Sequence, residues 1–105
     1  YTPAMIQSLL QIAQSHANAE LRAKVWTFFD GATTSDLLVA PLLHALRHDS
    51  SDAVRAEAAE TLGNYTERPE VRQALTWHAT NDKSKQVRDK ARRSVPGPWR
   101  SVRGR

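Results

Sequence analysis

The chain has 105 residues, of which 40% are hydrophobic and 25% are charged, and its net charge is +4 at pH 7. This composition suits one globular domain. The absence of cysteine excludes disulfides and thiolate metal sites. No run of about 18 apolar residues could span a membrane. No signal peptide is visible. The start at Tyr1 nevertheless indicates a fragment or processed product, so the compartment stays open between cytoplasm and periplasm.

The N-terminal segment predicts two helices. Thr2 can cap the first helix, with Pro3 at its first position. Its apolar stripe at helical spacing is Met5, Leu9, Ile12 and Ala13. Asn18 can cap the second helix, which Asp30 and Gly31 are expected to end. The stripe expected to be buried there is Leu21, Val25, Phe28 and Phe29.

The middle segment predicts another pair. Ser35 can cap its first helix, and Pro41 lies inside that helix, where it is expected to remove one hydrogen bond and bend the axis. The apolar stripe is Leu38, Leu42, Ala45 and Leu46. Ser50 or Ser51 can cap the second helix, and Gly63 can end it.

The last pair of predicted helices begins at Pro69. Its first helix has the apolar stripe Val71, Leu75 and Ala79, and its second helix is expected from about Lys85 to Val95. Residues 96–105 predict a basic, irregular tail because proline and glycine recur there. No segment shows sustained two-residue alternation, so no strands are expected.

A shift of 33 residues superposes the three pairs without a gap. The aligned sets are Leu21, Val54 and Val87; Arg22, Arg55 and Arg88; Val25, Ala58 and Ala91; and Phe29, Leu62 and Val95. A fixed period of this length is typical of a solenoid, in which each unit buries its apolar face on its neighbours. We expect units at about 2–31, 35–64 and 68–95, which together form a repeat domain over residues 1–95.

The middle unit contains the run D-x-x-x-x-V-R-x-x-A-A-x-x-L-G, formed by Asp49, Val54, Arg55, Ala58, Ala59, Leu62 and Gly63. This run resembles the HEAT-repeat family, particularly the short HEAT-like repeats of bacteria. Unit three has Arg92 in place of the second alanine, and unit one has His16 and Trp26 in place of the aspartate and that alanine. Over residues 3–95 the resemblance implies an all-α fold, a right-handed superhelical stack of three helical hairpins with six helices.

The resemblance also implies roles for the repeated charged residues. A hydrogen-bonded ladder between units would use Arg22, Arg55 and Arg88 with Asp49 and Asp82. The second helices would line a concave binding face, with outward positions Glu20, Lys24 and Thr27, then Ala53, Glu57 and Glu60, then Gln86, Lys90 and Arg93. This face runs from mixed to acidic to basic, which favours a protein or peptide partner over a uniform polyanion.

Two tryptophans interrupt the repeat pattern. Trp26 replaces the alanine found at Ala59, and it is expected either to fill space against an upstream neighbour or to be partly exposed. Trp77 aligns with the polar Gln11 and His44, so it is also expected to be partly exposed.

Few residues suggest chemistry. His44 and His48 have the spacing of two zinc ligands on one helix face, but Ala45 stands where H-E-x-x-H has glutamate, and no third ligand is apparent. Glu57 and Glu60 are interpreted as solvated surface. No nucleophile motif or Gly-rich phosphate loop occurs. We therefore expect no catalysis by this segment, no cofactor and no metal.

The positive charge is concentrated at one end. Residues 1–82 carry 6 Lys/Arg and 10 Asp/Glu, whereas residues 83–105 carry 9 Lys/Arg and one acid, Asp89. We interpret this end as a cap with a tail; an acidic protein, a membrane surface or nucleic acid are the other possible contacts. The sequence predicts a protein-interaction or scaffolding module, part of a larger protein. The alternatives are a nucleic-acid-binding domain that uses this end, or the helical side domain of a larger enzyme.

Overall fold

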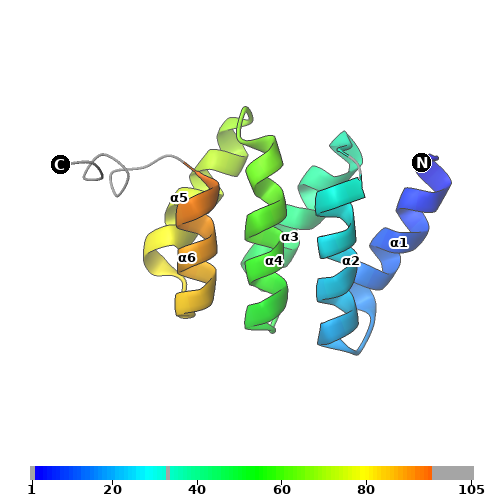
Figure 1. Cartoon of the computed structure of the whole chain (residues 1–105), viewed down its shortest axis with the longest axis horizontal. Coiled ribbons are helices and arrows are strands. Elements are labelled where there is room, and N and C mark those ends of the chain that lie inside the picture. The colour runs from blue at the N-terminus through cyan, green and yellow to red at the C-terminus, as the bar shows by residue number, and fades with distance from the viewer. Residues whose placement is uncertain (1, 33, 96–105) are drawn as a thin grey trace.

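A computed structural model describes residues 2–32 and 34–95, and in this part the chain forms three stacked helical hairpins (Figure 1). The helices are α1 (Pro3–Ser15), α2 (Ala19–Ala32), α3 (Val39–His48), α4 (Asp52–Leu62), α5 (Pro69–Asn81) and α6 (Lys85–Ser94). Short 3₁₀ turns span Asp36–Leu38 and Gly63–Tyr65. No strand occurs in either described range, so the prediction of an all-α fold with six helices is confirmed. The tail predicted at 96–105, with Trp99, lies outside the described residues.

The helices form two layers that differ in spacing. The second helices of the hairpins, α2, α4 and α6, pack directly against one another in chain order, and Figure 1 shows them side by side. The first helices, α1, α3 and α5, contact their own hairpin partners extensively but meet one another only slightly. Grooves are therefore left between neighbouring first helices.

Side-chain caps begin most of the helices. Thr2 Oγ1 accepts a hydrogen bond from the N–H of Met5 at 3.2 Å, and Asn18 Oδ1 accepts one from Glu20 at 2.8 Å. Ser51, rather than Ser50, caps α4. Each cap satisfies an N–H group that has no partner within the helix.

Two helix boundaries differ from the sequence expectation. Pro41 is the third residue of α3 rather than an interior residue, because the chain from Asp36 to Leu38 forms a 3₁₀ turn before the α-helix begins at Val39. In the first turn an N–H has no partner within the helix, so the expected loss of an intrahelical hydrogen bond does not occur. Helix α2 continues through Gly31 to Ala32.

Gly63 faces Ser94 at the end of α6. A Cβ atom placed on Gly63 would be 3.3 Å from the Cβ of Ser94, which is tighter than ordinary van der Waals contact. The absence of a side chain therefore allows the two helices to pack closely. Gly63 also follows the last residue of α4, as expected.

The predicted core is confirmed in unit two but is wrong in part of unit one. Leu38, Leu42, Ala45 and Leu46 are all buried. In unit one the structure buries Ile6, Leu10 and Trp26, whereas the predicted core residues Met5, Ile12, Leu21 and Phe28 are 49%, 36%, 38% and 43% exposed. Trp26 is fully buried, and its ring centroid lies 6.0 Å from that of Phe29, so partial exposure is excluded from the two alternatives for Trp26.

The two ends of the stack differ in chemistry. The exposed apolar positions of unit one correspond to Leu38, Ala45, Val54 and Thr61, all of which are buried in unit two. That unit has a preceding hairpin to cover them. Unit three, which has no following hairpin in the described ranges, shows the opposite pattern. Its exposed, polar residues Arg72, Thr76 and Arg92 occupy the repeat positions of the buried Ile6, Leu10 and Trp26. The C-terminal end is thus polar, and the N-terminal end is apolar.

Candidate functional site

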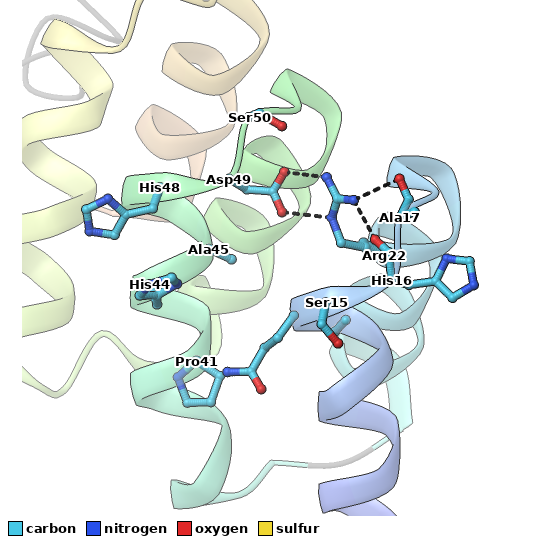
Figure 2. A pocket seen from close by; sticks show the side chains of 12 residues that line it. Ser15, His16, Ala17, Arg22, Pro41, His44, Ala45, His48, Asp49 and Ser50 are labelled. Carbon is cyan, nitrogen blue, oxygen red and sulfur yellow. Dashed lines mark hydrogen bonds and ion pairs between the residues drawn. The ribbon is translucent and has the colours of Figure 1, made fainter.

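The structure brings Arg22 of α2 against Asp49, the residue that ends α3. Arg22 Nε donates to Asp49 Oδ2 at 3.0 Å, and Nη2 donates to Oδ1 at 2.9 Å. Arg22 Nη1 donates to the carbonyl of His16 at 2.7 Å, so the guanidinium bridges units one and two (Figure 2). This two-pronged arrangement matches the planar guanidinium to the carboxylate and gives a strong, directional contact.

Arg55 and Asp82 repeat this geometry one unit further on. Arg55 Nε and Nη2 donate to the two oxygens of Asp82 at 3.3 and 3.1 Å, and Nη1 donates to the carbonyl of Asp49 at 3.0 Å. Arg55 Nη2 also donates to Asp52 at 2.7 Å. Both Arg55 and Asp82 are buried. Each arginine thus joins the carboxylate of the following unit to the backbone of its own.

Each aspartate also holds the turn that joins its two helices. Asp49 Oδ1 accepts a hydrogen bond from the N–H of Ser51 at 2.9 Å, and Asp82 Oδ1 accepts one from Ser84 at 2.9 Å. At the equivalent place in unit one, His16 Nδ1 accepts from the N–H of Asn18 at 3.0 Å. The imidazole therefore replaces the aspartate in closing the turn, but it cannot offer two oxygens to an arginine.

Burial and hydrogen bonding oppose each other at the two aspartates. Burial alone would raise the pKa of Asp49, but hydrogen bonds from Arg22 and from the N–H of Ser51 hold this pKa below its ordinary value. The pKa of Asp82 is likewise lowered, because hydrogen bonds from Arg55 and Ser84 outweigh its burial. Both carboxylates are therefore ionised at neutral pH.

Arg88, the third arginine of the repeat, differs from the other two. Its Nη1 donates to the carbonyl of Asp82 at 2.7 Å, which repeats the backbone contact of Arg22 and Arg55. Within residues 2–32 and 34–95 it forms no ion pair with a carboxylate. The carboxylate contact thus occurs at two of the three repeated positions.

His78 joins the second ladder pair and was missed by the sequence analysis. Its Nδ1 lies 2.9 Å from Asp82 Oδ2, and the imidazole is buried. Because an ionised carboxylate only accepts hydrogen bonds, His78 Nδ1 is the donor. The sequence signal was the i, i+4 spacing of His78, on α5, and Asp82, the residue that follows this helix. It was overlooked because position 78 aligns with the apolar Ala45 and Ile12.

The outward positions of α2, α4 and α6 form one surface, which we call the second-helix face. Its residues are Glu20, Lys24, Thr27, Ala53, Glu57, Glu60, Gln86, Lys90 and Arg93, and all are exposed or half-buried. Thr27 Oγ1 donates to Glu57 Oε1 at 2.9 Å, and Lys90 pairs with Glu60. Neighbouring helices are therefore linked across this face. A polar groove of about 500 Å³ lies at its end, beside Asp30, Glu60, Gly63, Asn64, Lys90, Arg93 and Ser94.

The two histidines of α3 lie next to each other with their rings tilted by 48°. The ring centroids of His44 and His48 are 4.8 Å apart, and both residues line a hollow of about 360 Å³ between α1 and α3. Figure 2 shows His48 extending away from the Arg22–Asp49 pair. Across the described ranges no three or more His, Asp or Glu side chains gather in a way that could hold a metal ion.

Stacked helical hairpins linked by a repeated arginine–aspartate contact define an α-solenoid. The family model for HEAT repeats matches residues 6–95, which is most of the chain. The chain therefore belongs to the HEAT-repeat family. Searches of curated proteins and of solved structures found no match. Among the described helices, none combines the length and apolar character needed to cross a membrane.

Proposed function

We propose that the chain is a protein-interaction or scaffolding module that binds a protein or peptide along the second-helix face. HEAT repeats are generally protein-interaction modules. The observation that carries the proposal is the continuous layer formed by α2, α4 and α6, whose surface combines acidic, basic and neutral polar side chains. The closer spacing of these helices supports a concave curvature on their side of the stack.

Nucleic acid is the second candidate, and the charges of the face oppose it. A duplex requires several cations spaced along one surface. Lys90 is paired with Glu60, and Lys85 is paired with Asp89 at 2.8 Å. Glu57 adds negative charge at the centre of the face. A mixed face of this kind suits the mixed charges of a folded protein or peptide better than a row of phosphates.

We propose a non-catalytic role for this segment. The ladder aspartates are held ionised by arginine, so neither has a pKa suited to proton transfer near neutral pH. Their contacts with Arg22 and Arg55 already serve to join units. A helical side domain of a larger enzyme would have the same properties, and it would use the second-helix face to contact its own catalytic domain.

Site-specific photo-crosslinking tests the proposed face. A benzophenone amino acid is introduced in the source cells at Lys24 or Gln86, which are exposed on α2 and α6, and at Gln11 or Ala40, which are exposed on α1 and α3. We expect a discrete protein adduct from the first two positions only. Loss of that adduct on Glu57→Lys substitution would assign it to the face. Adducts with nucleic acid would favour the second candidate, and adducts from α1 and α3 alone would refute the proposed surface.

A further inference from the structure

Trp77 is the most exposed large hydrophobic residue in the described ranges. It lies on α5, its side chain is 55% exposed, and its ring lies edge-on to that of His78 with centroids 4.8 Å apart. Tryptophan is among the residues enriched at binding hot spots, so an exposed tryptophan beside a groove is a candidate anchor for a partner. Trp77 therefore needs an explanation that the repeat packing does not provide.

Trp77 borders a groove on the side of the stack opposite the second-helix face. The groove lies between α3 and α5 and has a volume of about 430 Å³. Its lining residues are Arg47, His48, Gln73, Ala74, Trp77 and His78. A second hollow, of about 410 Å³, is also bordered by Arg47, His48 and Trp77, and it extends to Asn81 and Lys83. The two spaces share lining residues and together form one trough, which lies where α3 and α5 contact each other only slightly.

The trough carries positive charge that no neighbouring carboxylate neutralises. Its two acids, Asp49 and Asp82, are bound by Arg22 and Arg55. The exposed Arg47 and Lys83 form no ion pair with any carboxylate of residues 2–32 and 34–95. An aromatic ring and two available cations thus lie along one groove.

We propose that the trough between α3 and α5 binds an acidic peptide segment of a partner protein. An apolar side chain of the peptide packs against Trp77, and its carboxylates pair with Arg47 and Lys83. Charge complementarity selects an acidic occupant, and the aromatic ring selects one that also carries an apolar anchor. Only two cations are available, which is few for the regular phosphates of a nucleic acid. This surface is separate from the second-helix face, so the two proposals stand or fall independently.

Trp77 itself can report binding. The 105-residue chain carries Trp99→Phe, so that the buried Trp26 and the exposed Trp77 are its remaining tryptophans. The probe is a synthetic twelve-residue peptide of glutamate and aspartate with one central leucine and one phenylalanine. We expect saturable binding with a blue shift of emission. We expect Trp77→Ala to weaken binding at least tenfold, as measured by the fluorescence anisotropy of a labelled peptide. We expect the double variant Arg47→Glu, Lys83→Glu to weaken binding by at least the same factor.

The controls separate the trough from the general basic character of the chain. Gln7→Glu, which adds a negative charge at an exposed position of α1 outside both proposed surfaces, is expected to leave the affinity unchanged. A peptide in which the acids are replaced by lysine should bind the Arg47→Glu, Lys83→Glu variant better than the parent chain. The proposal is overturned if the double reversal or Trp77→Ala leaves the affinity intact. It is also overturned if the probe does not bind, or if a glutamate-only peptide or a DNA duplex binds equally well at the trough. The three substituted trough residues, Arg47, Trp77 and Lys83, are exposed, and circular dichroism verifies that the variants fold.

Discussion

Arg55 and Asp82 are 27 residues apart in the sequence, yet they form a two-pronged pair with donor–acceptor distances of 3.3 and 3.1 Å. The pair is buried, and the remaining Arg55 nitrogen is bound to the carbonyl of Asp49. One side chain thereby fixes the end of α3, the start of α4 and the end of α5 relative to one another. Removing Arg55 would leave Asp82 as a buried carboxylate without its arginine, whereas removing Asp82 would leave Arg55 with Asp52 as its remaining carboxylate partner.

Arg55→Ala is expected to destabilise the fold more than Arg47→Ala. The first change removes a buried, charge-assisted contact and should cost about 1–3 kcal/mol. The second removes an exposed side chain and should cost less than about 0.5 kcal/mol. Urea denaturation followed by circular dichroism measures both free energies of unfolding. Equal midpoints for the two variants would contradict a stabilising role for the ladder.

The lowered pKa values of Asp49 and Asp82 predict a loss of stability in acid. A carboxylate whose native pKa lies below its unfolded value stabilises the fold above the unfolded pKa of about 3.9. That contribution is lost as the pH falls through about 3.9 toward the native pKa. We expect the thermal midpoint of Asp82→Asn to vary less with pH between 2 and 6 than that of the wild type. Asp36→Asn, an exposed change, should retain the wild-type dependence.

His16 and Asp49 occupy the same place in their units. Substituting each by the other's residue type therefore separates closing the turn from pairing with an arginine. Asp49→His can retain the hydrogen bond from the Ser51 N–H, as His16 does with Asn18, but it loses the pair with Arg22. We expect a cost of about 1–3 kcal/mol. His16→Asp keeps the turn contact and should change stability by less than about 0.5 kcal/mol. Calorimetric unfolding of both variants measures the difference, and similar losses in the two would contradict the assignment.

Met5 and Leu38 also share a repeat position, but their burial differs. Leu38 is fully buried beneath the preceding hairpin, whereas Met5 is 49% exposed at the apolar end of the stack. Leu38→Ala should cost about 2–5 kcal/mol, the usual range for a buried leucine. Met5→Ala should cost about 1 kcal/mol or less, because much of its surface is already in water. Denaturant midpoints of the two single variants test this contrast directly.

These contrasts show which parts of the structure a repeat pattern can predict. The period located all six helices, since each unit repeats the same caps and apolar spacing. It could not assign burial at Met5 or Trp26, because burial depends on which side of a unit has a neighbour. The Arg55–Asp82 contact came from family resemblance, since nothing in a 27-residue separation indicates a contact. The pattern did not predict the role of His78, because this position aligns with the apolar Ala45 and Ile12. Its partner, Asp82, was already assigned to the ladder with Arg55.

The last prediction concerns the basic end, where protein binding and nucleic-acid binding give opposite results. Removing residues 97–105 should leave the thermal midpoint unchanged, because no repeat position lies beyond Val95. The intact chain should bind duplex DNA only weakly at physiological salt and without sequence preference. If about five phosphates are contacted, the logarithm of the affinity should fall with a slope near −4 to −5 against the logarithm of salt concentration.

Truncation should abolish this weak binding, because the cations left on α6 are partly committed. Lys85 is paired with Asp89 and Lys90 with Glu60, so neighbouring carboxylates already offset two of the positive charges on α6. Glu57 on the adjacent helix would repel phosphates that extend along the second-helix face. Fluorescence anisotropy of a labelled duplex, titrated across salt concentrations, measures both the affinity and the slope. A micromolar or tighter complex that survives the truncation would mean that the helices themselves hold the polyanion, and the nucleic-acid function would then replace the protein-binding one.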